Sequence, residues 1–195
     1  WGLQASAVEY SPFGYDFMDV AVVSKDSIWV VGDLVLFSSN GGSSWTSQGT
    51  AIEGFFYGVD FVTSRLGVAV DQFGRIIRTT NAGSTWTPAT SPTTNQLLSV
   101  SFADVSTGII VGDVGTILRS TTGGASWSVI SSGTTQLLRD AKFVTASTAI
   151  SVGTQGCILK SVDGGLTWQK KSSGVTAYLR SVHFINAQNG FASGD

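Results

Sequence analysis

The stretch Ser161-Val162-Asp163-Gly164-Gly165-Leu166-Thr167-Trp168 decides the fold of this chain, because close copies of it recur upstream. The copies read SSNGGSSW (38–45), TTNAGSTW (79–86) and STTGGASW (120–127). Their closing tryptophans stand 41 residues apart, and Trp1 stands 44 residues before the first of them. Such a period indicates one small structural unit repeated along the chain, and units of this kind bury their apolar faces only against neighbours.

Each repeat contains two runs that are typical of β-strands. The first run alternates apolar and polar residues, as a strand does, and lies at 20–22, 59–61, 100–102, 141–143 and 182–184. The second is an apolar or small run at 29–31, 68–70, 109–111, 150–152 and 191–193. A continuous apolar run fits a strand that is covered on both faces.

Two further strands complete the unit. A third is predicted at 34–37, 75–78, 116–119 and 157–160, and in the last three repeats Gly74, Gly115 or Gly156 supplies the positive φ of the preceding hairpin turn. A fourth starts at each box tryptophan and contains Pro88, which is tolerated almost only at a sheet edge. Lys170 and Lys171 protect the same edge.

Four short antiparallel strands per repeat, running from an inner strand to an outer edge, are the unit of a β-propeller blade. We therefore expect an all-β fold, with residues 1–195 as a single propeller domain of four complete blades and a partial fifth. Both ends fall inside a repeat, which favours a piece of a larger propeller. The alternative is a closed five-bladed ring in which residues 1–6, which have the phase of an outermost strand, pair near the last blade.

Composition excludes several classes of function. The chain has 11 basic and 13 acidic side chains, so a net charge of −2 cannot drive binding to nucleic acid or to an anionic membrane surface. No apolar run approaches the roughly 20 residues of a membrane-spanning helix. Cys157 is the single cysteine and is expected to be a small core residue. We expect no cofactor and no metal ion, and no direct insertion into a membrane.

The repeated block resembles the Asp-box, or BNR repeat, of sialidase-like propellers. In such a block an Asx side chain bonds backbone amides within its own turn, and the indole packs between blades. The resemblance implies a structural role for Asn40, Asn81, Asp163, Trp45, Trp86, Trp127 and Trp168. Because only Asp163 keeps the carboxylate, a regular metal site in the boxes is not expected.

The match extends beyond the box. A Gly-x-Ile-Leu-Arg-Ser/Thr stretch before it, a Ser-Gly-Thr-Thr linker, Leu-x-x-Val-x-Phe and Gly-x-x-Val-Gly resemble the repeat of photosystem II assembly factors of the Ycf48/Hcf136 type. The resemblance covers nearly the whole chain from Phe17 onward. It implies a non-enzymatic propeller in the thylakoid lumen that holds a membrane-protein intermediate, in part through surface arginines. Without the resemblance, the location expected is secreted or otherwise extracytoplasmic.

Two sets of cations are candidates for partner binding. Arg78, Arg119 and Lys160 occupy one repeat position just before the box, where they could take acidic loops of a partner or simply face solvent. Arg139 and Arg180 share a second position, at which other repeats carry Met18, Tyr57 and Leu98. This pair breaks the repeat. Because the position leads into the inner strand, we expect the pair to form a binding face near the central opening with Tyr57 and Tyr178.

The polar members of the inner strands are expected to line a water-filled channel. They are Asp60, Ser101, Lys142 and His183, with Ala21 in the first repeat. A lone histidine does not make a metal site.

The function expected is a protein-binding scaffold without enzymatic activity, either an assembly factor or a peripheral subunit of a membrane complex. A secreted carbohydrate-binding or adhesive surface module is the alternative, with a glycan as its partner. A sialidase-like glycoside hydrolase is less favoured, since the hydrolysis needs paired carboxylates and the two glutamates, Glu9 and Glu53, lie outside the regular strands.

Overall fold

The computed structural model describes residues 15–195, and their strands form four four-stranded antiparallel sheets and one two-stranded sheet. Blade 1 contains β1 (Phe17–Val22), β2 (Ile28–Gly32), β3 (Val35–Ser38) and β4 (Thr46–Gln48). Blade 2 contains β5 (Phe56–Phe61), β6 (Gly67–Asp71), β7 (Ile76–Thr79) and β8 (Thr87–Ala89). Blade 3 contains β9 (Leu97–Phe102), β10 (Gly108–Gly112), β11 (Ile117–Ser120) and β12 (Ser128–Ile130). Blade 4 contains β13 (Leu138–Phe143), β14 (Ala149–Gly153), β15 (Ile158–Ser161) and β16 (Gln169–Lys171), and blade 5 contains β17 (Leu179–Phe184) and β18 (Gly190–Gly194).

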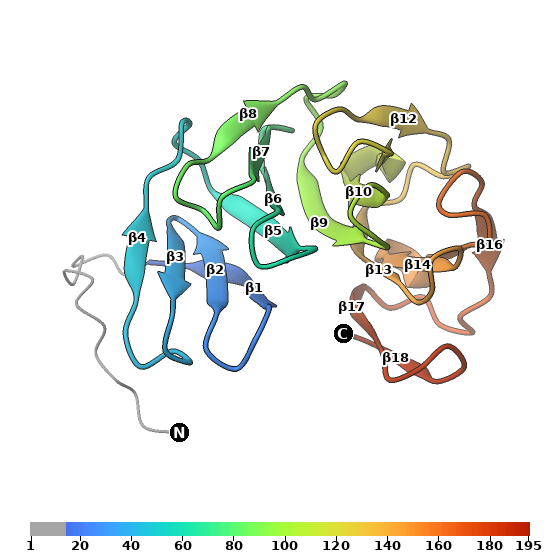
Figure 1. The fold of residues 1–195 in the computed structure, drawn as a ribbon. Helices are drawn as coiled ribbons and strands as arrows, with labels where there is room; N and C mark the ends of the chain where they lie inside the picture. The colour runs from blue at the N-terminus through green and yellow to red at the C-terminus, as the bar shows by residue number, and fades with distance from the viewer. Residues whose placement is uncertain (1–14) are drawn as a thin grey trace.

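The blades stand around a common axis, with the first strand of each blade innermost (Figure 1). Within a blade the strands follow one another as neighbours in chain order. The inner strands β1, β5, β9, β13 and β17 lie next to one another in that order. The expected fold class, with four complete blades and a partial fifth, is therefore confirmed.

Burial within a blade follows the order of the strands. All five residues of β6 and of β10 are buried, as expected for strands covered on both faces. The fourth strands are short and mostly exposed, and β8 contains Pro88 at the sheet edge. The third strands of blades 1 to 4 begin one residue later than the pattern predicts, and each fourth strand begins one residue after its tryptophan.

The core lies between blades rather than within them. One cluster joins blades 1 and 2 and contains Trp86, a second joins blades 2 and 3 and contains Trp127, and a third joins blades 3 and 4 with Trp168 packed against it. Trp45 is half-buried and lies outside these clusters. Since each interface is filled from two adjacent repeats, no blade has a complete core alone.

Within residues 15–195, the first and the last blade each have one face without a neighbouring blade, and these faces are exposed. Val20 and Val22 on β1 are 53% and 65% exposed, and all five residues of β18 are exposed. The outer strand expected at residues 1–6 lies outside the described part of the chain. Within residues 15–195, no helix is long and apolar enough to cross a membrane.

Candidate functional site

The repeated boxes are turns closed by their own side chains. In the fourth, Asp163 Oδ1 accepts hydrogen bonds from the Thr167 amide at 2.9 Å and from Ser161 Oγ at 2.8 Å, and its Oδ2 accepts one from Thr167 Oγ1. The side-chain bond from Thr167, followed by the Thr167 amide, lowers the pKa of Asp163 to about 2. Asn40, Asn81 and Thr122 accept the equivalent amide bonds in the other boxes. The turn therefore requires an oxygen at this position but not a charge.

The first residue of each box is a buried hydroxyl that binds the far side of the turn. Ser161 Oγ accepts the Gly165 amide at 2.9 Å, and Ser120 Oγ accepts the Gly124 amide at 3.0 Å. Each glycine lies against the preceding blade, where an added Cβ would come within 2.8 Å of Ile109 or 2.6 Å of Val68. The recurring Ser/Thr and Gly are thus explained by turn closure and close packing between blades.

Two of the repeated cations also connect blades. Arg78 Nε on blade 2 donates to the Gly123 carbonyl of blade 3 at 2.7 Å, and Arg119 Nε on blade 3 donates to the Gly164 carbonyl of blade 4 at 2.6 Å. Both side chains are half-buried. Lys160 occupies the same position on blade 4 and makes no side-chain hydrogen bond within residues 15–195. The structure gives the two arginines a folding role, whereas partner binding at this position stays a prediction.

Blade 1 makes the corresponding connection with a different residue. Phe37 stands at the repeat position of Arg78, and it packs in the cluster between blades 1 and 2. Gln48, on the outer strand β4, instead donates from Nε2 to the Ala82 carbonyl at 3.2 Å and accepts the Trp86 Nε1 proton at 3.2 Å. Every complete junction between blades therefore has an outer side-chain bond to the box of the next blade.

The inner strands are joined by a second series of bonds. Asp19, Asp60, Ser101 and Asp140 each accept a backbone amide proton from the inner strand of the following blade, from Val59, Phe102, Phe143 and Val182 respectively. Sequence reasoning placed Asp60 and Ser101 in the channel and missed Asp19 and Asp140. Asp19 and Asp140 occupy a position two residues earlier in the repeat, where Gly58 and Ser99 stand in blades 2 and 3. The alternation of polar residues along the inner strands could have indicated this position.

A small cavity of about 200 Å³ opens at the end of the channel where the inner strands begin. Met18, Tyr57, Leu98, Arg139 and Arg180 line it, one from each of the five blades. The structure thus brings Tyr57, Arg139 and Arg180 together around one opening. Arg139 Cζ lies 5.7 Å from the ring centroid of Tyr57, and Arg180 Cζ lies 4.5 Å from that of Tyr178. We call Tyr57, Arg139, Tyr178 and Arg180 the channel-mouth site.

The charged side chains around this cavity differ in how many hydrogen bonds and ion pairs they make within the protein. Asp140 accepts bonds from the Val182 amide and from the Ser99 and Ser181 hydroxyls, and Asp19 accepts the Val59 amide, so both carboxylates of the cavity are already bonded. Burial raises the pKa of Asp19, against the bond from Val59 and the charge of Lys142. Arg180 pairs with Asp195 at 2.7 Å.

Arg139 differs from its neighbours at the channel mouth. It donates no hydrogen bond to any residue in the range 15–195, although a guanidinium has five N–H donors. Arg139 therefore has capacity for an external anion, as does Lys142, which lines the same cavity and makes no side-chain hydrogen bond within residues 15–195.

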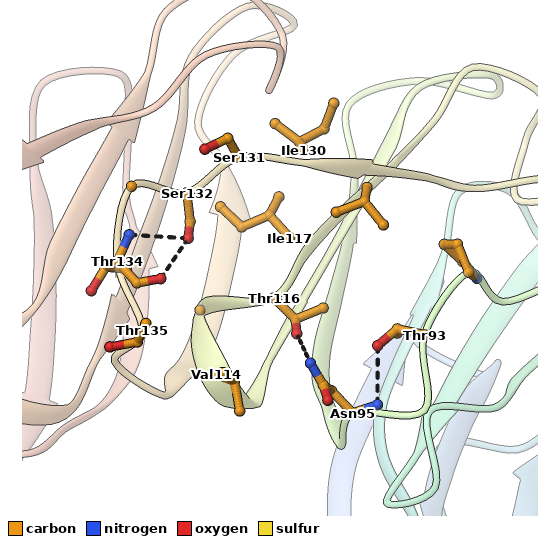
Figure 2. A pocket seen from close by; sticks show the side chains of 14 residues that line it. Thr93, Asn95, Val114, Thr116, Ile117, Ile130, Ser131, Ser132, Thr134 and Thr135 are labelled. Carbon is orange, nitrogen blue, oxygen red and sulfur yellow. Dashed lines mark hydrogen bonds between the residues drawn. The ribbon is translucent and has the colours of Figure 1, made fainter.

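A wider groove lies near the outside of blade 3. It has a volume of about 670 Å³ and runs between the linker at Thr93 and Asn95, the hairpin at Val114 and Thr116, and the linker from Ser131 to Thr135 (Figure 2). Its lining is hydroxyl, amide and aliphatic, without a charged or aromatic side chain. Asn95 Nδ2 donates to Thr116 Oγ1 at 2.9 Å, so part of the polar lining is satisfied internally (Figure 2).

The remaining residues singled out from the sequence have ordinary surroundings. Cys157 is buried in the cluster between blades 3 and 4, and burial raises the pKa of its thiol. His183 is exposed on β17. Lys142 lines the channel-mouth cavity. None of these arrangements pairs a nucleophile with a base.

Comparison with known structures identifies the class of protein: the chain is a β-propeller built of four-stranded antiparallel blades. It is similar to a structure of Ycf48 bound to a D1 peptide, with a TM-score of 0.57 and 14% identity over 98% of this chain and 95% of that chain. Ycf48 from Cyanidioschyzon merolae gives a TM-score of 0.51 and 19% identity, with 94% and 81% covered.

Enzymes share the architecture. A GH74 enzyme from Niastella koreensis is similar with a TM-score of 0.70 and 18% identity, over 85% of this chain and 31% of that chain. No protein-family model matches the chain, and no curated protein matches it. At these identities the similarities establish the fold.

Proposed function

We propose that this propeller is a non-enzymatic scaffold that binds a protein partner through the channel-mouth site. The observation that carries the proposal is Arg139, which lies over Tyr57 beside the central cavity with its N–H donors unoccupied by residues of the described chain. Arginine and tyrosine are enriched among the residues that dominate binding energy at protein interfaces. A carboxylate of a partner would accept charge-assisted hydrogen bonds from the unoccupied N–H donors of the Arg139 guanidinium.

The proposal extends to the kind of partner. The repeat resembles that of the photosystem II assembly factors, and one similar structure is Ycf48 bound to a D1 peptide. We therefore propose an assembly factor or a peripheral subunit of a photosynthetic membrane complex, acting outside the cytoplasm and, in a photosynthetic cell, in the thylakoid lumen.

The proposed absence of catalysis rests on the channel carboxylates. Asp19, Asp60 and Asp140 each hold a backbone amide of the next blade, so moving one of them towards a substrate would break a bond between blades. A general acid or base must exchange its proton with substrate during each cycle. These carboxylates are better suited to holding the ring together.

The test is retention of a photosynthetic complex on the immobilised protein. Solubilised thylakoid membranes are passed over the parent chain, an Arg139→Ala, Arg180→Ala double variant, and an Arg65→Ala control that removes an exposed arginine from a different loop. We expect a photosystem subunit, identified by mass spectrometry, on the parent and control but not on the double variant. Equal retention on all three would contradict the proposal.

Glycan binding is the second candidate, favoured by the hydroxyl-lined groove of Figure 2 and by the similarity to GH74 enzymes. Affinity electrophoresis through gels that contain xyloglucan distinguishes the two. Retardation of the parent and of the double variant alike would support the glycan and exclude the channel-mouth site as its receptor.

A further inference from the structure

The hairpin between β6 and β7 departs from the repeat. Blade 2 carries Asp71 where blades 1, 3 and 4 carry Gly32, Gly112 and Gly153. In blades 3 and 4 the preceding linker occupies the space of a Cβ, because the carbonyls of Gln96 and Leu137 lie against those glycines. Blade 2 makes the same bond between hairpin and linker, but the Gln72 amide lies 3.4 Å from the Phe55 carbonyl, against 2.9 Å and 3.0 Å for the equivalent bonds of blades 3 and 4, and a carboxylate fits.

Asp71 positions the rest of this hairpin. It is fully buried, and its Oδ1 accepts the amides of Phe73 at 2.9 Å and Arg75 at 2.8 Å. Its Oδ2 accepts Arg75 Nε at 2.6 Å, and Arg75 Nη2 also donates to the Glu53 carbonyl at 2.8 Å. The guanidinium is thereby fixed with its Cζ 5.0 Å from the centroid of the Phe73 ring.

The turn itself does not need this arrangement. Blades 3 and 4 close hairpins of the same length without a buried ion pair, through left-handed residues at Val114 and Gln155. Blade 2 therefore carries an ion pair that a hairpin of this length does not require, and two amides and the Arg75 guanidinium compensate the burial of the Asp71 charge. The ion pair fixes the Arg75 guanidinium over the ring of Phe73, and this phenylalanine is 58% exposed.

This hairpin is continuous with the channel-mouth site. The Gln72 amide donates a hydrogen bond to the Phe55 carbonyl, and the Phe55 ring packs edge-on against the Tyr57 ring with the centroids 5.1 Å apart. The Arg139 guanidinium lies over the Tyr57 ring. We call Phe55, Tyr57, Phe73 and Arg75 the blade 2 strip. Phe73 and Arg75 stand at one end of the strip, and the adjacent Phe55 and Tyr57 rings lead from them to the unbonded Arg139.

We infer that the blade 2 strip and the channel-mouth site are one docking surface for an extended acidic peptide with an aromatic residue. The inference rests on the proposed function and adds the chemistry of the partner. A carboxylate of the peptide bonds Arg139, and an aromatic side chain packs on Phe73 beside Arg75, where ring contacts and the adjacent cation both favour it. The hairpin tips of blades 3 and 4 present Val114 and Gln155 and lack such a platform.

Synthetic peptides test this surface. Three are compared by fluorescence anisotropy: one with acidic residues and a phenylalanine, a second with that phenylalanine replaced by alanine, and a third with the acidic residues replaced by lysine. Against the parent chain we expect the first to bind tightest, the second about tenfold more weakly, and the third not measurably.

The variants are Phe73→Ala, Arg139→Ala and, as a matched control, Val114→Ala, which truncates the exposed residue at the same repeat position on blade 3. Phe73→Ala should remove the difference between the first two peptides, Arg139→Ala should weaken both, and Val114→Ala should change neither. Persistence of the phenylalanine preference in Phe73→Ala overturns the inference, while the proposed function stands if Arg139→Ala still weakens binding. If no acidic peptide binds the parent, the inference and protein binding at the channel mouth fail together.

Discussion

Two sets of cations repeat around the propeller, and the structure treats them differently. Arg78 and Arg119 each reach a glycine carbonyl in the box of the next blade, and that acceptor recurs because the box recurs. Arg139 and Arg180 replace apolar or aromatic residues of other blades and lie over tyrosines; Arg180 pairs with Asp195, and the Arg139 side chain donates no hydrogen bond within residues 15–195. Arg78 and Arg119, which follow the repeat, thus acquire a repeated structural partner, whereas Arg139, which breaks the repeat, stays available to a ligand.

The sharpest test of this contrast is Arg119→Ala. Removing the guanidinium leaves the buried side of the Gly164 carbonyl without its donor, and hydrogen bonds to charged groups contribute about 1.5–3 kcal/mol. We expect the free energy of unfolding to fall by that amount in urea titrations. Lys160→Ala, at the same repeat position without a bonded acceptor, is the control, and an equal loss in both variants would show that the bond between blades is unimportant.

Gln48→Ala extends the contrast to blade 1. This amide bridges the Ala82 carbonyl and the Trp86 indole, so its truncation removes two neutral bonds at one junction. We expect a loss of about 1–2 kcal/mol in the free energy of unfolding, because neutral bonds are each worth about 1 kcal/mol. Unchanged stability would mean that the apolar cluster of this junction, with Trp29 and Phe61, is sufficient alone.

Arg139→Ala should show the opposite behaviour. We expect the affinity for the acidic peptide to fall about tenfold, which is roughly 1.4 kcal/mol, while the free energy of unfolding changes by less than about 0.5 kcal/mol. Anisotropy and urea titration on the same preparation measure the two. A large loss of stability would place Arg139 with the structural cations.

The smallest effect is expected at Asp60, a channel carboxylate that is bonded to the Phe102 amide. Burial raises its pKa above 3.8, opposed by that amide bond and by Lys142. The folded state therefore holds the proton more tightly than the unfolded state, so the carboxyl stabilises the fold as the pH falls towards 3.8 and loses this contribution as the pH rises.

Asp60→Asn keeps an oxygen acceptor and removes the charge. Relative to the parent chain, its free energy of unfolding should therefore increase with pH above 3.8, by less than about 1 kcal/mol. Thermal unfolding at a series of pH values measures the difference. A difference that is independent of pH would contradict the raised pKa.

The sequence predicted the blades because their signals are local and repeated. The tryptophan spacing, the apolar runs of β6 and β10 and the edge proline at Pro88 need no knowledge of neighbouring blades. The sequence also placed Tyr57, Arg139 and Arg180 at one opening, because residues at the same repeat position lie at the same level along the propeller axis.

Contacts between blades were harder to foresee. The bond from Arg78 to Gly123 depends on the rotation between two sheets, which the pattern of one repeat does not contain. The blade 2 strip was missed for another reason. Asp71 is visible in a repeat alignment as the exception among glycines, but its consequence, an exposed Phe73 under Arg75, appears only once the hairpin is folded.

Where a side chain bonds the backbone of another blade within residues 15–195, the side chain belongs to the earlier blade of the pair. The outer donors Gln48, Arg78 and Arg119 reach forward to the next blade, and the inner acceptors Asp19, Asp60, Ser101 and Asp140 receive amides that reach back from it. A duplicated or deleted unit would therefore meet its new neighbours with the correct half of each bond already in place. Genes for such arrays can therefore gain or lose whole blades during evolution without needing new residues at the interface between blades.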